Sequence, residues 1–267
     1  MRRKKVKKFS KAAKFLLFVG IAGTVCFATL IANYMIINRQ EEAYYASLPV
    51  FFAQDDGGQN ENIEQPVSLD ARIEPKEKIK WPAVDFEAIL KEFPNAAAWI
   101  RINGTGINYP VMYGADNQYY LTHRPDGKSS RSGSIFIDYR NSSDFSNQNT
   151  FIYGHRMRSG AMFGMLSKYG NQSFYDEHPI VSILTPKGNY ELQLFAGYVF
   201  NQREETQAMK FSNAKSFENY IQNAKRRSIF KSDVKVNYGD LLATLCTCEY
   251  SFDDARLFLV GKLVKEN

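Results

Sequence analysis

Outside the apolar N-terminal segment, few residues of this sequence can act through sulfur or imidazole. Cys246 and Cys248 stand two residues apart at the end of the apolar run 241–248. Because side chains alternate across a strand, the two thiols are expected to share one face. The three histidines of the chain are His123, His155 and His178. These five side chains are therefore the candidates for nucleophilic, acid–base or metal-binding chemistry.

The pair Cys246/Cys248 has four interpretations that the pattern alone leaves open. Both residues can be small buried side chains of a β-core. A zinc site commonly needs four Cys or His ligands, and three scattered histidines give no clear second pair. A redox disulfide is disfavoured, since residues i and i+2 of an extended strand lie about 6.5–7 Å apart, at the limit for an unstrained bridge. A cysteine nucleophile needs a histidine that is close in space and remote in sequence.

His155 and Arg256 are the residues best placed to assist a cysteine. His155 follows an apolar run and a glycine, at the exit from a strand to a loop, which is a common place for a site residue on a rigid scaffold. A structural, hydrogen-bonded histidine is the alternative. Arg256 opens the last apolar run, and its short interval from Cys248 suits a hairpin that brings the two together. It is then either a surface partner of a neighbouring aspartate or a fixed cation beside the thiol.

The elements that must position these residues are mainly strands. Eight short apolar runs, separated by turn residues, predict a β-barrel or β-sandwich. The runs cover 99–102, 109–112, 134–138, 150–153, 180–184, 190–200, 241–248 and 257–264. One-sided apolar spacing predicts a helix over 84–94, with Asp85 as its N-cap, and a longer helix over 213–229 between two late strands. A shorter helix is expected over 161–169. The predicted fold class is mainly β with added helices.

The positive charge of the chain is confined to its N-terminus. Of the 34 Lys and Arg residues, eight lie in residues 1–14, and no acidic residue precedes Glu41. Residues 41–267 hold 25 basic and 28 acidic residues. A nucleic-acid-binding domain needs a basic face on its folded part, which this balance disfavours. Three cysteines in 267 residues exclude a disulfide scaffold.

Residues 15–37 predict a membrane anchor. They contain no charged residue, and about 20 apolar residues suffice to cross the bilayer core. The run is longer than the roughly 7–15 residues of a signal-peptide core, so an uncleaved span is favoured. The basic segment 1–14 is expected to stay in the cytoplasm, which makes the chain a single-pass type II membrane protein. Residues 38–80 are polar and predict an extracytoplasmic linker, and 81–267 the folded domain.

Several of these motifs together resemble the sortases. Thr244-Leu245-Cys246-Thr247-Cys248 matches the sortase TLxTC signature, and His155 and Arg256 fall where those enzymes carry a histidine and an arginine. The segments 99–123 (WIRINGTGINYPVMYGADNQYYLTH) and 133–141 (GSIFIDYRN), and the expected helix over 213–229, are similar to class B sortases in particular. The resemblance covers about residues 84–264.

The resemblance implies a fold and a set of catalytic roles. The fold is an eight-stranded β-barrel with N-terminal helices and a long helix inserted between the sixth and seventh strands. Cys248 is then the nucleophile, His155 the general acid/base and Arg256 the cation on the oxyanion side. Thr247, Cys246 and Glu249 are candidates for substrate contacts. Class B members often have serine where this chain has Cys246, and a thiol is the weaker hydrogen-bond donor, which puts a polar contact from that position in doubt.

The implied reaction is transpeptidation without a cofactor or a metal. A C-terminal sorting signal of the LPxTG or NPxTN type is cleaved after its threonine through a thioester. The acyl group then passes to an amine of a peptidoglycan cross-bridge, of its lipid-linked precursor, or of a pilin lysine. Two alternatives from other classes remain: a non-catalytic module that binds sorting signals, and a thiol or metal protein that uses the C-x-C pair.

Overall fold

The first of two compact units of the chain is a single long helix. The computed structural model describes residues 10–48, 84–201, 207–248 and 254–266, and the chain divides into Met1–Ser47 and Leu48–Asn267. Helix α1 (Lys11–Ser47) contains the expected span 15–37 and continues through Ser47. Its most apolar window has a mean hydropathy of 2.4, and α1 is long and apolar enough to cross a membrane. Residues 1–9 of the basic tail and 49–80 of the expected linker lie outside the described residues.

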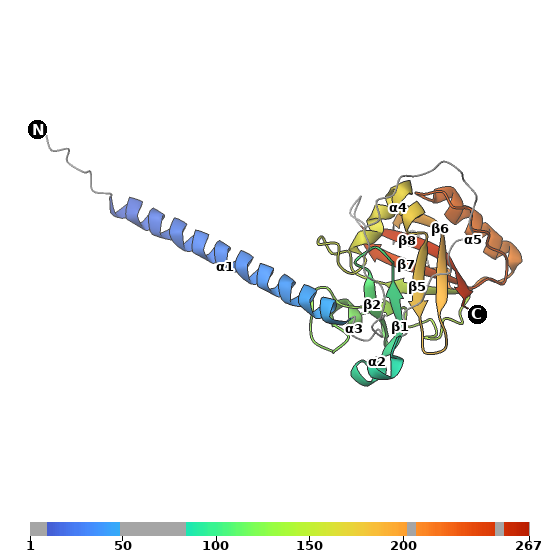
Figure 1. The fold of residues 1–267 in the computed structure, drawn as a ribbon. Coiled ribbons are helices and arrows are strands. Elements are labelled where there is room, and N and C mark those ends of the chain that lie inside the picture. The colour runs from blue at the N-terminus through green and yellow to red at the C-terminus, as the bar shows by residue number, and fades with distance from the viewer. Residues whose placement is uncertain (1–9, 49–83, 202–206, 249–253, 267) are drawn as a thin grey trace, which may run out of the picture. The chain divides into compact units, whose positions relative to one another are not determined.

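The second unit is a closed barrel of eight strands (Figure 1). The strands are β1 (Ala96–Arg101), β2 (Asn108–Tyr113), β3 (Ile135–Ile137), β4 (Asn149–Tyr153), β5 (Ile180–Leu184), β6 (Tyr190–Asn201), β7 (Leu242–Cys248) and β8 (Ala255–Lys265). Their order around the barrel is β1-β2-β3-β4-β7-β8-β6-β5. Each strand coincides, within three residues at either end, with one of the eight apolar runs of the sequence. The predicted mainly β fold is confirmed.

Helices decorate the barrel where the sequence changes to helical spacing. Helix α2 (Phe86–Glu92) begins after Asp85, whose carboxylate accepts a hydrogen bond from the backbone N–H of Ala88 at 2.9 Å. Helix α5 (Ala214–Arg227) confirms the insert between two late strands, and a capping box of Asn213 and Ser216 starts it. The expected helix over 161–169 is a 3-10 helix, η2, which spans Gly164–Gly170. The short helices α3 (Tyr119–Thr122) and α4 (Gln172–Glu177) were not predicted.

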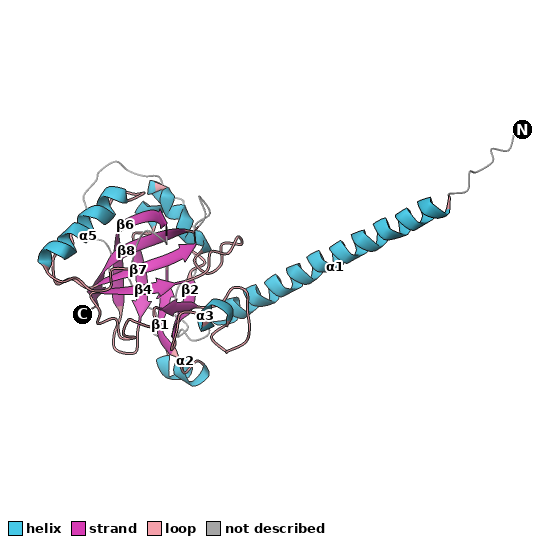
Figure 2. Ribbon diagram, turned by 180° about the vertical axis from the view of Figure 1, so that it is seen from behind, coloured by secondary structure: helices cyan, strands magenta, loops and turns pink. Residues whose placement is uncertain are grey.

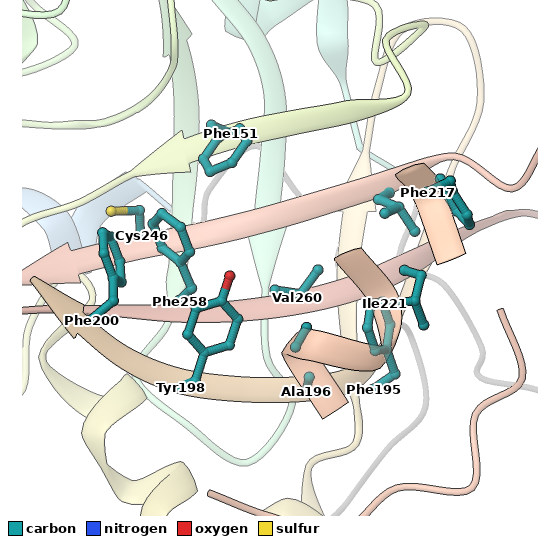
Figure 3. Packing of buried hydrophobic residues seen from close by; sticks show 12 residues of the cluster. Phe151, Phe195, Ala196, Tyr198, Phe200, Phe217, Ile221, Cys246, Phe258 and Val260 are labelled. Atoms are coloured by element: carbon teal, nitrogen blue, oxygen red, sulfur yellow. The ribbon is translucent and has the colours of Figure 1, made fainter. Parts of the chain in front are cut away.

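The apolar face of α5 and the late strands form one core cluster. Phe217, Ile221 and Ala224 are the buried residues of α5. They join a cluster with aromatic residues of β4, β6 and β8, among them Phe151 and Phe258, and with Cys246 of β7 (Figure 3). This packing covers one flank of β7 and fixes its position in the barrel.

The pairing directions bring four strand ends to one rim of the barrel. Strand β7 runs parallel to β4 and antiparallel to β8, and β8 runs antiparallel to β6. The carboxyl ends of β4, β6 and β7 therefore meet the amino end of β8, and Figure 2 shows these strands side by side. The TLxTC segment ends at this rim.

Candidate active site

Strand β7 places the cysteine pair between β4 and β8. In the register of β7 with β8, Cys248 lies opposite Arg256. In the register of β7 with β4, Cys246 lies opposite Tyr153. The hairpin expectation for Cys248 and Arg256 is therefore confirmed at the level of the backbone; the side chain of Cys248 is not among the described atoms.

A glycine carries the chain from β4 to His155. The backbone N–H of Gly154 donates to the carbonyl of Cys246 at 3.1 Å, which extends the pairing beyond the strand. A Cβ at Gly154 would collide with the Ile135 side chain and with the Phe163 ring. Only glycine therefore allows this close packing, and the sequence Tyr-Gly-His has a steric basis.

The ring of His155 is held by a backbone carbonyl. Its Nε2 lies 2.7 Å from the carbonyl oxygen of Leu121, in α3. Because a carbonyl oxygen only accepts hydrogen bonds, Nε2 carries a proton and donates it. In the neutral ring, Nδ1 is then the nitrogen with the lone pair. A second contact fixes the loop that follows, since the backbone N–H of Phe163 donates to the carbonyl of His155 at 3.0 Å.

His155, Arg256 and the TLxTC segment line one pocket. Its volume is about 280 Å³. The lining residues are Asn117, Gln118, Leu121, Phe136, Arg140, Tyr153, Gly154, His155, Phe200, Gln207, Cys246, Thr247 and Arg256. The structure thus brings together His155, Arg256, Cys246 and Thr247 of the predicted site. Glu249 lies outside the described residues.

Cys246 forms part of an apolar floor. Only 4% of the residue is exposed, and it belongs to the same core cluster as Phe200 and Phe258. Figure 3 shows its sulfur on the side of Phe200. Thr247 is also buried, and its hydroxyl has no hydrogen-bond partner among the described residues.

The polar side chains that line the pocket are held from behind by a buried carboxylate that the sequence analysis did not single out. Asp138 is fully buried at the end of β3. It accepts hydrogen bonds from Nε and Nη2 of Arg140 at 2.9 and 2.7 Å, from the Tyr153 hydroxyl at 2.9 Å, and from Nδ2 of Asn117 at 3.0 Å. Arg140 also donates to the amide oxygen of Gln207 at 3.2 Å. Four lining side chains are thus linked directly or indirectly to one carboxylate; we call this set the Asp138 cluster.

The Asp138 cluster is held in one charge state. Burial alone would raise the pKa of Asp138, but the hydrogen bonds from Arg140, Tyr153 and Asn117 outweigh it and hold the pKa below its ordinary value. The hydrogen bonds to Asp138 raise the pKa of Arg140. Burial, and then the nearby Cys246 and Asp138, raise the pKa of Tyr153. The wall therefore presents a neutral phenol and a guanidinium around an ionised carboxylate.

The other two histidines lie outside this pocket. His123 stacks on Tyr119, with ring centroids 4.1 Å apart, and its Nδ1 lies 2.9 Å from the carbonyl oxygen of Tyr119. The ring of His178 lies 4.5 Å from that of Phe174, measured between centroids. Both fit structural roles. Among the described residues, no three Cys, His, Asp or Glu side chains gather to hold a metal ion.

The site therefore combines a strand-end cysteine motif with a histidine and an arginine on the rim of a closed barrel. This arrangement is that of a cysteine acyl-transfer enzyme built on a β-barrel. Comparison with known proteins gives the family.

The chain is 31% identical over 263 residues to sortase B of Staphylococcus aureus, which covers 98% of this chain and 99% of that protein. It is 40% identical over 168 residues to sortase B of Listeria monocytogenes, which covers 62% of this chain and 68% of that protein. No family model matches the chain. The chain belongs to the sortase B family and is a sortase-type cysteine transpeptidase.

Solved structures agree with this assignment. A sortase B–substrate complex of S. aureus superposes with a TM-score of 0.65 and 36% identity, covering 68% of this chain and 85% of that chain. Sortase B of Clostridium perfringens superposes with a TM-score of 0.63 and 32% identity, covering 67% of this chain and 100% of that chain. The predicted class and barrel type are confirmed. Sortases are enzymes of the cell surface, and the apolar helix α1 fits a membrane anchor.

Proposed function

We propose that this transpeptidase cleaves a C-terminal sorting signal of the LPxTG or NPxTN type after its threonine and transfers the acyl group to an amine. The observation that carries the proposal is the pocket at the β4, β7 and β8 rim. There, His155 and Arg256 line one cavity, and the backbone of Cys248 lies opposite Arg256. The relatives named above support sorting-signal substrates and amine acceptors in general.

In the first half-reaction, Nδ1 of His155 takes the proton of the Cys248 thiol, and the resulting thiolate attacks the threonine carbonyl and forms the C–S bond. The C–N bond of the scissile amide then breaks, and the leaving amine takes a proton from His155. The described contact of Nε2 with the Leu121 carbonyl assigns this transfer to Nδ1. Arg256 and a backbone N–H stabilise the tetrahedral oxyanion, and one such donor is typically worth about 3 kcal/mol.

In the second half-reaction, an amine nitrogen attacks the thioester carbonyl. The C–S bond breaks, the thiolate leaves, and the proton of the amine returns to the Nδ1 of His155. The floor of the pocket, which includes Cys246 and Thr247, receives the side chains of the sorting signal. Glu249, next to the nucleophile, is a further candidate contact.

The helix α1 anchors the enzyme where its substrates pass. We propose a single-pass type II arrangement, because eight basic residues precede the apolar span and basic flanks stay in the cytoplasm. The barrel then faces outward, and a secreted substrate meets a tethered enzyme at the membrane surface.

Trapping the acyl-enzyme tests this function. The full chain in detergent micelles is incubated with peptides of the LPxTG, NPxTN and SPxTG types, with and without a glycine-type amine, and its intact mass is followed. We expect an adduct equal to the N-terminal peptide fragment, which disappears when the amine is added. Cys248→Ala should form none, whereas the matched variant Cys246→Ala should still form it. No adduct with any peptide would contradict the proposal.

A further inference from the structure

A second cavity is lined by residues that directly follow His155 in the chain. Its volume is about 590 Å³, within the usual range for a small-molecule site. Its lining residues are Gly106, Tyr109, Arg156, Met157, Arg158, Ser159, Gly160, Ala161, Gly164, Met165, Ser167 and Lys168. Three of these are cations, and no Asp or Glu lines it among the described residues. We call it the basic cavity.

The loop that forms the basic cavity has a defined conformation. Arg156 forms a β-bridge with Met162, and the backbone N–H of Gly160 donates to the Met157 carbonyl at 3.0 Å. The backbone N–H of Met162 donates to the Tyr109 hydroxyl at 3.0 Å, which ties the loop to β2. The cations are therefore presented by a closed loop, so that less ordering is needed when a ligand binds.

The chemistry of the lining suits an oxyanion. Two guanidinium groups, Arg156 and Arg158, and the ammonium of Lys168 are the groups that bind carboxylates and phosphates with charge-assisted hydrogen bonds. The hydroxyl of Ser159 adds a donor, since it only accepts, from the backbone N–H of Ala161, whereas the hydroxyl of Ser167 donates to the Gly164 carbonyl. Arg156 directly follows His155, so the lining of the basic cavity begins at the residue after the one that handles the proton of the acceptor amine.

We infer that the basic cavity binds the anionic part of the amine acceptor, and this inference rests on the proposed function. Peptidoglycan peptides carry carboxylates, and their lipid-linked precursors carry a pyrophosphate as well. Both are oxyanions on the same molecule as the attacking amine. Binding of the anion in the basic cavity places the acceptor on the His155 side of the thioester, while the sorting signal occupies the pocket lined by Cys246.

The test separates the two half-reactions. The variant Arg158→Gln/Lys168→Gln removes two cations of the basic cavity, and Lys215→Gln/Arg226→Gln removes two exposed cations of α5 as a charge-matched control. Acyl-enzyme is formed first with a sorting peptide, and its decay is then followed by intact mass. The acceptors are a stem peptide with free carboxylates, the same peptide amidated, triglycine amide, and a lipid-linked precursor with and without its pyrophosphate.

We expect the cavity variant to form acyl-enzyme at the wild-type rate and to react normally with triglycine amide. Its aminolysis by the anionic acceptor should fall about tenfold, while the α5 variant stays at the wild-type rate. If aminolysis by the free-carboxylate peptide becomes slower, the basic cavity binds the carboxylates of the peptide. If only aminolysis by the lipid-linked precursor with its pyrophosphate becomes slower, the basic cavity binds the pyrophosphate of the lipid carrier. Arg158→Lys should retain most of the activity.

An equal fall with anionic and neutral acceptors, or no fall with either, would overturn the inference. If no acyl-enzyme forms even in the wild type, the basic cavity is tested by binding alone. Isothermal titration calorimetry then measures the binding of inorganic pyrophosphate and of the stem peptide to the wild type and to the cavity variant. Binding that is lost in the cavity variant then supports the basic cavity while the proposed function fails. Binding that is absent, or equal in both proteins, refutes the basic cavity as well.

Discussion

The two cavities whose linings meet in the chain at His155 and Arg156 are built in different ways. The pocket of about 280 Å³ is formed by strand ends, with an apolar floor and a polar wall fixed on a buried carboxylate. The basic cavity of about 590 Å³ is formed mainly by the loop after His155 and by η2. The first is suited to hold one peptide backbone in register with a nucleophile. The second is suited to attract a charged group of variable size.

Under the proposed function, this difference would let one histidine serve two substrates. His155 is held by the Leu121 carbonyl of α3 and by the close packing at Gly154. The side chains that face the sorting peptide and those that face the acceptor are then drawn from separate parts of the chain. Changes in one cavity should therefore affect one half-reaction and leave the other close to the wild-type rate.

The largest expected effect is on the shared residue. His155→Ala should lower the rate of acylation by about 10²- to 10⁴-fold, since the leaving amine loses its proton donor. Aminolysis of any thioester that forms should fall as well. The measurement is single-turnover acylation by intact mass. His123→Gln, which changes a histidine outside the pocket, is the matched control and should act at the wild-type rate. A fall of less than threefold for His155→Ala would show that another group transfers the proton.

The wall of the first pocket should be sensitive to the loss of one charge. Asp138→Asn keeps the shape but removes the ionised acceptor of three side chains, which should lower the free energy of unfolding by about 3 kcal/mol at pH 7. A larger loss of stability is not expected, because the Arg140 side chain is 44% exposed and water can solvate its guanidinium in the variant. Urea denaturation of the full chain in micelles measures the change.

The pH dependence of this difference follows from the lowered pKa of Asp138. A depressed folded-state pKa gives stability that is present above the unfolded value of about 4 and is lost as the pH falls through the folded value. The difference in the free energy of unfolding between wild type and Asp138→Asn should therefore become smaller as the pH falls below about 4. The exposed Asp233→Asn serves as control. A difference in the free energy of unfolding that stays constant from pH 7 to pH 3 would contradict the assignment of an ionised Asp138.

The sequence predicted the first cavity far better than the second, for a physical reason. Strands follow from apolar runs and turn residues, which are local, and the TLxTC, His155 and Arg256 motifs lie at the ends of β7, β4 and β8. The Asp138 cluster depends on partners as remote as Asn117, and no local pattern marks it. The net charge of residues 41–267 is slightly negative, and this average gave no sign that three cations of one loop and η2 line the same cavity.

The loop of the basic cavity offers a structural test with a built-in control. A Cβ at Gly164 would collide with the backbone carbonyl of Met157, whereas a Cβ at Gly170, at the other end of η2, meets nothing within 4 Å. Gly164→Ala should lower the free energy of unfolding by on the order of 2 kcal/mol, because backbone has to move. Gly170→Ala should be close to neutral. Thermal denaturation monitored by circular dichroism compares the two.

The variants Gly164→Ala and Gly170→Ala also test whether the two cavities act in different half-reactions. Displacement of the loop should weaken aminolysis by anionic acceptors in Gly164→Ala and leave the acylation rate within about twofold of wild type. If Gly164→Ala instead lowers acylation as much as aminolysis, the loop and the pocket act as one structural unit. The two cavities then do not serve separate half-reactions.

The smallest expected effect concerns the floor of the first pocket. Cys246 packs in the cluster that contains Phe200 and Phe258, and only 4% of it is exposed. In such surroundings a hydroxyl is disfavoured, so Cys246→Ser should lower the free energy of unfolding by about 1 kcal/mol, and by more than Cys246→Ala does. Urea denaturation gives the stabilities, and acylation kinetics give KM for the sorting peptide. If Ser is the more stable variant and also lowers KM relative to Ala, position 246 makes a polar contact with substrate and the floor is less apolar than its packing indicates.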